Sequence, residues 1–104
     1  MQVTTKLGLS FNLTARSEQT LCDFHDEVVD EANGKAVGIY SAWLHDMSAR
    51  VIGIGGYSAN SISSEDSFVV NGRTVYVCLS DEAKEMIGGK VLDFKGNYFD
   101  LAPP

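Results

Sequence analysis

Four side chains in this sequence belong to the types that bind transition metals, namely Cys22, His25, His45 and Cys78. Cys22 and His25 are three residues apart, a spacing that places two side chains on the same side of a helix. Thiolate and imidazole groups are common ligands of zinc and iron. Two neighbouring ligands make only half of a tetrahedral site, and packing in partly buried positions also accounts for both residues. We expect no metal and no cofactor, and iron or iron–sulfur binding by these four residues stays as an alternative.

A glycine-rich stretch, "VIGIGGYSANS" at residues 51–61, follows an apolar run in the way a nucleotide-binding loop follows its strand. A G-x-G-x-x-G fingerprint needs a glycine at position 58, where the chain has Ser58. The next residues, "YSANSISSED", lack the apolar period of the helix whose N-terminus would hold a phosphate. We therefore expect a strand from Val51 to about Ile54 that runs into a glycine-loosened bend, without a phosphate site.

His45 and Asp46 are neighbours and could suggest acid–base chemistry. Side chains adjacent in a strand point to opposite faces, so their adjacency does not make them partners. Their context, "LHDMSA" between two apolar segments, predicts a hairpin turn. None of the abundant serines lies in a G-x-S-x-G elbow. We find no catalytic residues and expect that the protein is not an enzyme.

Acidic residues recur at spacings of three and four along the expected long helix, at Asp23, Asp26, Glu27 and Asp30. They lie opposite the apolar side that begins at Leu21, and the helix contains no lysine that would relieve their mutual repulsion. A solvated helix face accounts for this pattern. The alternative is a docking surface for a basic protein partner, whose association such a field would accelerate.

The elements that position these residues are indicated by hydrophobic period and by turn signals. Alternating apolar residues predict a strand over residues 3–13, with Leu7 on its buried face. Thr14 is a helix N-cap, and the apolar period continues to about Ala32, before the stop signal Asn33-Gly34. Further strands are expected at residues 35–44, 49–58, 67–70 and 73–79, and as a pair around Lys95-Gly96-Asn97.

Short polar connections join most of these strands, and Asn71-Gly72 favours a tight hairpin. Ser80 caps a short helix, "DEAKEMI", which ends at Gly88-Gly89. The pattern predicts one α+β domain over residues 1–104, with a mainly antiparallel or mixed sheet, one long N-terminal helix and one short C-terminal helix.

The bulk composition limits the classes of partner. With 14 acidic and 8 basic residues, the 104-residue chain has a net charge of −6, which disfavours direct binding to nucleic acid and to anionic membranes. The chain has no apolar run of roughly 20 residues, the length of a membrane span, and no leader pattern. Two cysteines are too few for a disulfide framework. We expect a cytoplasmic protein, while its oligomeric state is left open.

Three stretches of the chain resemble the HesB-like family of A-type iron–sulfur carriers. "LTARSEQTL" is similar to the family's opening helix, and "AVGIY" to its next strand. The stretch "DSFVVNGRTVYVCLSDEAKEMIGGKVLDF" resembles its hairpin, short helix and following strand. The resemblance covers most of the chain from Leu13 onward and implies a HesB-like topology.

The ligands of that family are absent from this chain. The family uses three cysteines, one in a C-S-G context and two in a C-G-C near the C-terminus. Here the corresponding regions read "WLHDMSA" and "NYFDLAPP", and neither Cys22 nor Cys78 falls at a matching place. The resemblance therefore implies a divergent member that keeps the fold without carrying a cluster.

We accordingly expect a small cofactor-free binding or regulatory protein that acts through protein–protein contacts. Its expected surface is the acidic helix, with Trp43 or Tyr57 as additional contact residues. One alternative is an acidic inhibitor, of the kind found in mobile elements, that occupies the groove of a nucleic-acid-binding protein. The other alternative is the iron or iron–sulfur binder described above.

Overall fold

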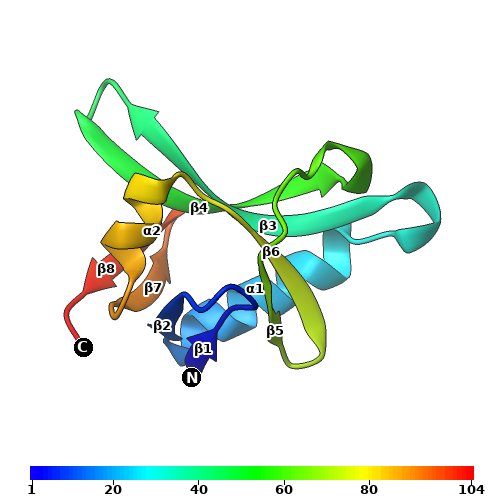
Figure 1. Ribbon diagram of the computed structural model, residues 1–104, viewed down its shortest axis with the longest axis horizontal. Helices are drawn as coiled ribbons and strands as arrows, with labels where there is room; N and C mark the ends of the chain where they lie inside the picture. Colours follow the sequence, from blue (N-terminus) through cyan, green and yellow to red (C-terminus); the bar gives the residue numbers. More distant parts are fainter.

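Two four-stranded sheets and two helices make up the computed structural model, which describes residues 1–104 (Figure 1). This arrangement confirms the predicted α+β class. Neither helix is long and apolar enough to cross a membrane. In chain order the elements are β1 (Gln2–Thr4), β2 (Ser10–Leu13), α1 (Ala15–Val28), η1 (Glu31–Asn33), β3 (Lys35–Leu44), β4 (Ala49–Ser58), η2 (Ala59–Ser61), β5 (Ser67–Val70), β6 (Arg73–Cys78), α2 (Asp81–Ile87), β7 (Val91–Lys95) and β8 (Tyr98–Ala102).

The strand orders are β1-β2-β7-β8 in the first sheet and β4-β3-β6-β5 in the second. Neighbours joined by a hairpin run antiparallel, whereas β2 pairs with β7 and β3 pairs with β6 in parallel. Both sheets are therefore mixed. The first sheet combines strands from the two ends of the chain, and the second lies between them in sequence.

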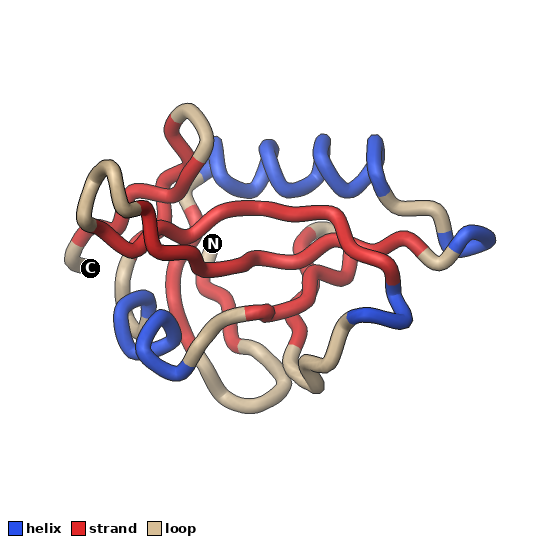
Figure 2. Tube along the Cα trace, turned by 90° about the horizontal axis from the view of Figure 1, so that it is seen from above, coloured by secondary structure: helices blue, strands red, loops and turns tan.

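One hydrophobic core of 16 buried residues joins the sheets and both helices. The rings of Phe11 on β2 and Phe68 on β5 meet edge to face, with centroids 5.4 Å apart, and so connect the two sheets directly. Figure 2 shows α1 running along the strands. Leu21, on this helix, is buried in the core. A single core of this kind fits a chain of this length.

The N-terminal segment differs from the single strand predicted over residues 3–13. It forms β1 and β2, which pair antiparallel around a turn where Gly8 has φ +96°. Glycine occupies this left-handed region without strain, so the chain reverses there. Leu7, predicted to be buried, lies in the turn and is 67% exposed. The apolar alternation was correct only for Leu9 to Leu13.

The long helix begins after the Thr14 cap as predicted but ends at Val28, four residues earlier than expected. Val29 has extended dihedral angles, and Asp30 caps the separate 3-10 turn η1 through its side chain. Two consecutive β-branched residues and an aspartate that bonds to its own following backbone both disfavour a continued helix. The predicted helix end near Ala32 is therefore wrong.

The glycine-rich segment is a regular strand. The ladder between β3 and β4 continues through Gly55 and Gly56 to Ser58, so the predicted bend after Ile54 is wrong. The glycines leave room for aromatic rings: a β-carbon on Gly53 would stand 2.6 Å from the Tyr40 ring, and one on Gly55 would stand 3.3 Å from both Tyr40 and Tyr57.

The other turn and cap predictions are confirmed. Asn71 and Gly72 have φ +49° and +79° in the hairpin between β5 and β6. The Ser80 side chain accepts a hydrogen bond from the backbone N–H of Ala83 and caps α2. His45 and Asp46 are exposed in the turn between β3 and β4.

Candidate functional site

The acidic face of α1, predicted from residue spacing, is exposed to solvent. Asp23, Asp26 and Glu27 are exposed, whereas Leu21 and Cys22 on the opposite side are buried against the core. Asp23 accepts a hydrogen bond from the Gln19 amide at 2.7 Å. The helix therefore presents three carboxylates outward from a surface that packing holds in place.

One of these carboxylates has a cationic partner that the helix sequence does not contain. Arg73, on β6, donates to Asp26 in a two-pronged pair, with Nε–Oδ1 and Nη2–Oδ2 distances of 2.7 and 2.9 Å. The guanidinium holds the pKa of the Asp26 carboxyl below its ordinary value. The helix supplies no lysine, but an arginine from the sheet relieves the repulsion at Asp26. Glu27 has no such partner.

Asp30 lies beyond the end of α1, not on its surface. Its carboxylate accepts hydrogen bonds from the backbone and the side-chain amide of Asn33, and these bonds lower the pKa of Asp30. The residue is exposed and continues the negative surface past the helix end. We call Asp23, Asp26, Glu27 and Asp30 together the acidic face.

Trp43, one of the two aromatic residues proposed as further contacts, does not border this face, whereas Tyr57 lies near Val28 at the end of β4. Trp43 is 51% exposed and pairs with Arg50 near the far end of β3. In contrast, Val28 of α1 lies against Gly56, which pairs with Val37 near the start of β3. Trp43 therefore lies at the opposite end of the strand from the acidic face.

The four candidate metal ligands are not brought together. No group of three or more histidine, cysteine, aspartate or glutamate side chains has a geometry that suits a metal ion. Cys22 is buried beside the Asn71 amide at 3.5 Å, and His45 is exposed in the β3–β4 turn. Cys22 and Cys78 are both free thiols. Cys22 and His25 are three residues apart on the same helix, but His45 and Cys78 do not join them to form the alternative iron or iron–sulfur site.

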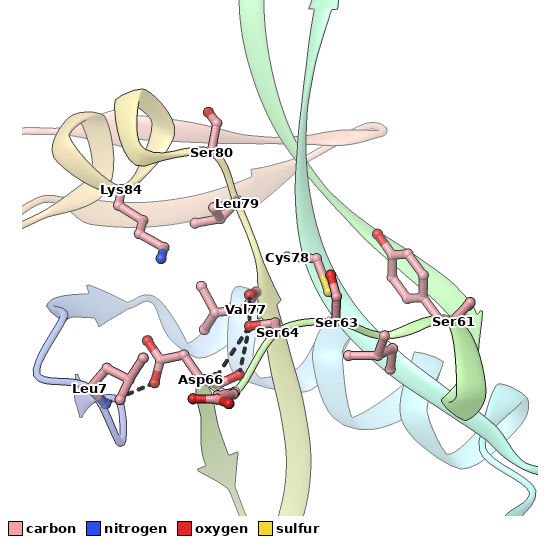
Figure 3. Close-up of a pocket in the computed structure, with 13 residues that line it drawn as sticks. Leu7, Ser61, Ser63, Ser64, Asp66, Val77, Cys78, Leu79, Ser80 and Lys84 are labelled. Atoms are coloured by element: carbon pink, nitrogen blue, oxygen red, sulfur yellow. Dashed lines mark hydrogen bonds between the residues drawn. The ribbon is translucent and has the colours of Figure 1, made fainter.

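Cys78 instead faces a pocket of about 640 Å³ (Figure 3). We call this hollow the β6-end pocket; it is bordered by the β1–β2 turn, the end of β4, residues 61–66, the end of β6 and α2. Burial raises the pKa of the Cys78 thiol, while a hydrogen bond with Tyr57 opposes part of this shift. The thiol is therefore protonated at neutral pH, a state in which it is a poor nucleophile and metal ligand.

The wall formed by residues 61–66 is held by buried hydrogen bonds. The carboxylate of Asp66, which is 2% exposed, accepts from the Thr5 hydroxyl at 2.8 Å, the Leu7 N–H at 2.9 Å and the Ser67 N–H at 3.0 Å. The Ser64 hydroxyl donates to the carbonyl of Val77 on β6. These bonds fix the turn that carries Leu7 and the wall in one arrangement.

The sequence reasoning missed this pocket. The serine-rich composition of its wall predicts an exposed loop, whereas Ser64 is half-buried and Asp66 is buried. Nothing local indicates that Asp66 contacts residues about 60 positions earlier in the chain. Such a bond depends on how β1 and β5 approach each other. No sequence motif around Thr5 or Asp66 predicts their hydrogen bond.

Comparison with protein-family models, with curated proteins and with solved structures finds no match for this chain. The HesB-like topology therefore stays a prediction that rests on the sequence motifs.

Proposed function

We propose that this protein is a small binding or regulatory protein that captures a basic protein partner on its acidic face, without a cofactor and without catalysis. The observation that supports the proposal is the exposed row of carboxylates on α1, opposite a buried apolar side. Asp23 and Glu27 are exposed on α1 and form no ion pair. A positive partner surface would find complementary charges here at fixed positions.

The overall charge favours the same kind of partner. The net charge of −6 adds a long-range attraction for basic surfaces, which mainly raises the association rate and weakens with salt. The Arg73–Asp26 pair gives the face a defined pattern, because Asp26 is already paired whereas Asp23 and Glu27 have no ion pair. Lysine side chains of a partner would reach Asp23 and Glu27 first.

The Arg73–Asp26 pair determines which acidic residues can be reversed in charge to test the proposal. Reversing Asp26 would leave Arg73 facing another cation, so a loss of binding could reflect a disturbed helix. The double variant D23K/E27K changes the face and leaves that pair intact. The matched control, D46K/E85K, changes two exposed acidic residues in the β3–β4 turn and on α2. Each substitution adds two charges, so both variants move the net charge from −6 to −2.

The probe is a fluorescein-labelled peptide of alternating lysine and alanine residues, titrated at low ionic strength with fluorescence anisotropy as the readout. We expect D23K/E27K to weaken binding about tenfold relative to D46K/E85K, which corresponds to about 1.4 kcal/mol. Backbone NMR shifts of the wild-type protein should concentrate on α1. Equal affinities for the two variants, or shifts spread over the whole surface, would show only a non-specific charge effect and would contradict the proposal.

A further inference from the structure

The β6-end pocket contains a cationic side chain without a partner. All three arginines of the protein form ion pairs, with Asp93, Glu82 and Asp26 respectively. Lys84 on α2 is half-buried, lines the pocket and has no carboxylate within 4.0 Å, and its amino group points into the hollow in Figure 3. A partly desolvated ammonium group without a counterion is a favourable position for an anion.

An apolar side chain is fixed at the border of the same pocket. Leu7 is 67% exposed, although burial of a leucine side chain normally contributes about 1.5–3 kcal/mol. Its backbone N–H is bonded to Asp66, so the turn cannot simply rotate Leu7 away. Leu79, which packs partly on the core, lies on the same side of the β6 end as Lys84 in Figure 3. The pocket therefore offers apolar surface beside the ammonium group.

The two acidic residues of the lining decide which anion fits. Asp66 uses its carboxylate for the three donors described above, and Glu65 is exposed at the border. Neither neutralises Lys84, yet both add negative potential. A multiply charged phosphate is disfavoured in this field, whereas a monoanion that gains most of its binding free energy from apolar contact is favoured.

We propose that the β6-end pocket is a binding site for a small amphipathic monocarboxylate, whose carboxylate pairs with Lys84 and whose hydrocarbon chain lies against Leu7 and Leu79. A volume of about 640 Å³ lies within the range of pockets that take small molecules. The hydrogen bonds of Asp66 and Ser64 hold the wall in advance, so little ordering accompanies binding. This site involves other residues than the acidic face.

The test is an NMR titration of the full chain with octanoate, compared with octanol and with inorganic phosphate. We expect saturable shifts at Leu7, Leu79 and Lys84 with octanoate, and weaker binding of the other two probes. The variant K84M keeps the aliphatic stem and removes the charge, so octanoate affinity should fall about tenfold. K90M is the matched control, because Lys90 is half-buried like Lys84, lacks an ion pair and lies outside the pocket. This variant should leave the octanoate affinity unchanged.

Three results would each overturn the proposal: no saturable shift at the pocket, equal octanoate affinity in K84M and wild type, or octanol or phosphate binding as tightly as octanoate. The variant L7Q provides a second measurement if K84M alters the spectrum of the free protein. It keeps Lys84 and the backbone bond to Asp66 but removes apolar surface, and octanoate affinity should fall while phosphate affinity stays the same. An unchanged octanoate affinity in L7Q would contradict the placement of the chain.

Discussion

The Tyr40 ring lies across Gly53 so closely that a β-carbon at this position would stand 2.6–2.7 Å from three atoms of the tyrosine. Tyr40 and Gly53 are direct cross-strand partners of β3 and β4. The Tyr40 ring covers the backbone of Gly53, which has no side chain to shield it. At this position the glycine serves packing between strands, not a turn or a ligand.

We therefore expect Gly53→Ala to destabilise the protein by about 1–3 kcal/mol, the usual cost of forcing extra atoms into a packed site. Urea unfolding followed by circular dichroism measures the loss. Gly88→Ala is the control, because a β-carbon there would meet nothing closer than 3.4 Å and φ is −57°. The destabilisation by Gly53→Ala should shrink when Tyr40 is replaced by leucine. If Gly53→Ala destabilised the Tyr40→Leu protein as much as the wild type, the ring would be excluded as the cause.

At the residue scale, sequence reasoning recognised which residue types matter and missed what they contact. Gly53, Gly55 and Gly56 all lie in the β3–β4 ladder, so the bend predicted after Ile54 was wrong. A glycine favours a turn and also permits close approach of a ring, and only the register with Tyr40 separates these cases. The role of Asp66 was invisible for a similar reason, because its donors lie in a distant segment.

At the scale of elements, α1 is attached to the first sheet through one buried hydroxyl. Ser17, fully buried, donates to the carbonyl of Leu92 at 2.8 Å and accepts from the N–H of Phe94 at 2.8 Å. Both partners belong to β7, more than 70 residues later in the chain. The serine thus replaces a strand neighbour for one edge of β7, and α1 is fixed in position along it.

Replacing Ser17 with alanine would take away the acceptor of the Phe94 N–H, whereas the Leu92 carbonyl would keep its hydrogen bond from the Thr14 N–H at 3.1 Å. We expect a loss of about 1–3 kcal/mol in the free energy of unfolding, since unsatisfied buried polar groups carry a desolvation cost. Thr20→Ala is the matched control on the same helix, because the exposed Thr20 hydroxyl bonds only to the Arg16 carbonyl one turn earlier. Chemical denaturation compares the two, and equal effects would show that Ser17 is not a special contact.

Local signals predicted most elements well where one local interaction dominates. Thr14 and Ser80 cap the two helices, and Asn71-Gly72 forms its hairpin, because each depends on neighbouring residues alone. The prediction failed where local choices compete. The apolar alternation that includes Leu7 is interrupted by the turn at Gly8. The apolar helical period extends beyond Val28, but Asp30 caps a separate 3-10 turn there and the helix ends.

At the scale of the whole molecule, acid sensitivity follows from three aspartates. Ion pairs or hydrogen bonds hold the pKa values of Asp26, Asp30 and Asp93 below the ordinary value of 3.8. For Asp93 the causes are Arg16, at 2.7 Å, and the Thr14 hydroxyl, at 2.8 Å. A lowered folded pKa stabilises the protein above the unfolded pKa, and this stabilisation is lost as the pH falls through the folded pKa.

We therefore expect the contribution of these carboxylates to be constant at neutral pH and to decline below about pH 4. Urea midpoints measured across the acid range give the slope. Asp93→Asn should lower the midpoint at neutral pH and flatten the decline, since the variant has no carboxyl to protonate at that position. A variant with the same acid slope as the wild type would show that Asp93 does not contribute to it.

The division of the strands into two sheets was beyond local reasoning. The α+β class follows from element types and connections, whereas the parallel pairs β2–β7 and β3–β6 depend on contacts between distant segments. The acidic face likewise was predicted from helical spacing, but Arg73 on β6 reaches Asp26 across 47 positions of the chain. The sequence thus indicates which surfaces exist and leaves open what lies beside them.

The interleaved strand order has a consequence for synthesis on the ribosome. The β4-β3-β6-β5 sheet is complete once Cys78 has emerged, but β2 has no inner neighbour until β7, which begins at Val91, is available. Until then β2 lacks its parallel partner, and Leu13 lacks Leu92, the residue with which it pairs. An incomplete sheet edge of this kind is prone to association with other chains. Pairing of β7 with β2 is therefore the step that completes the first sheet.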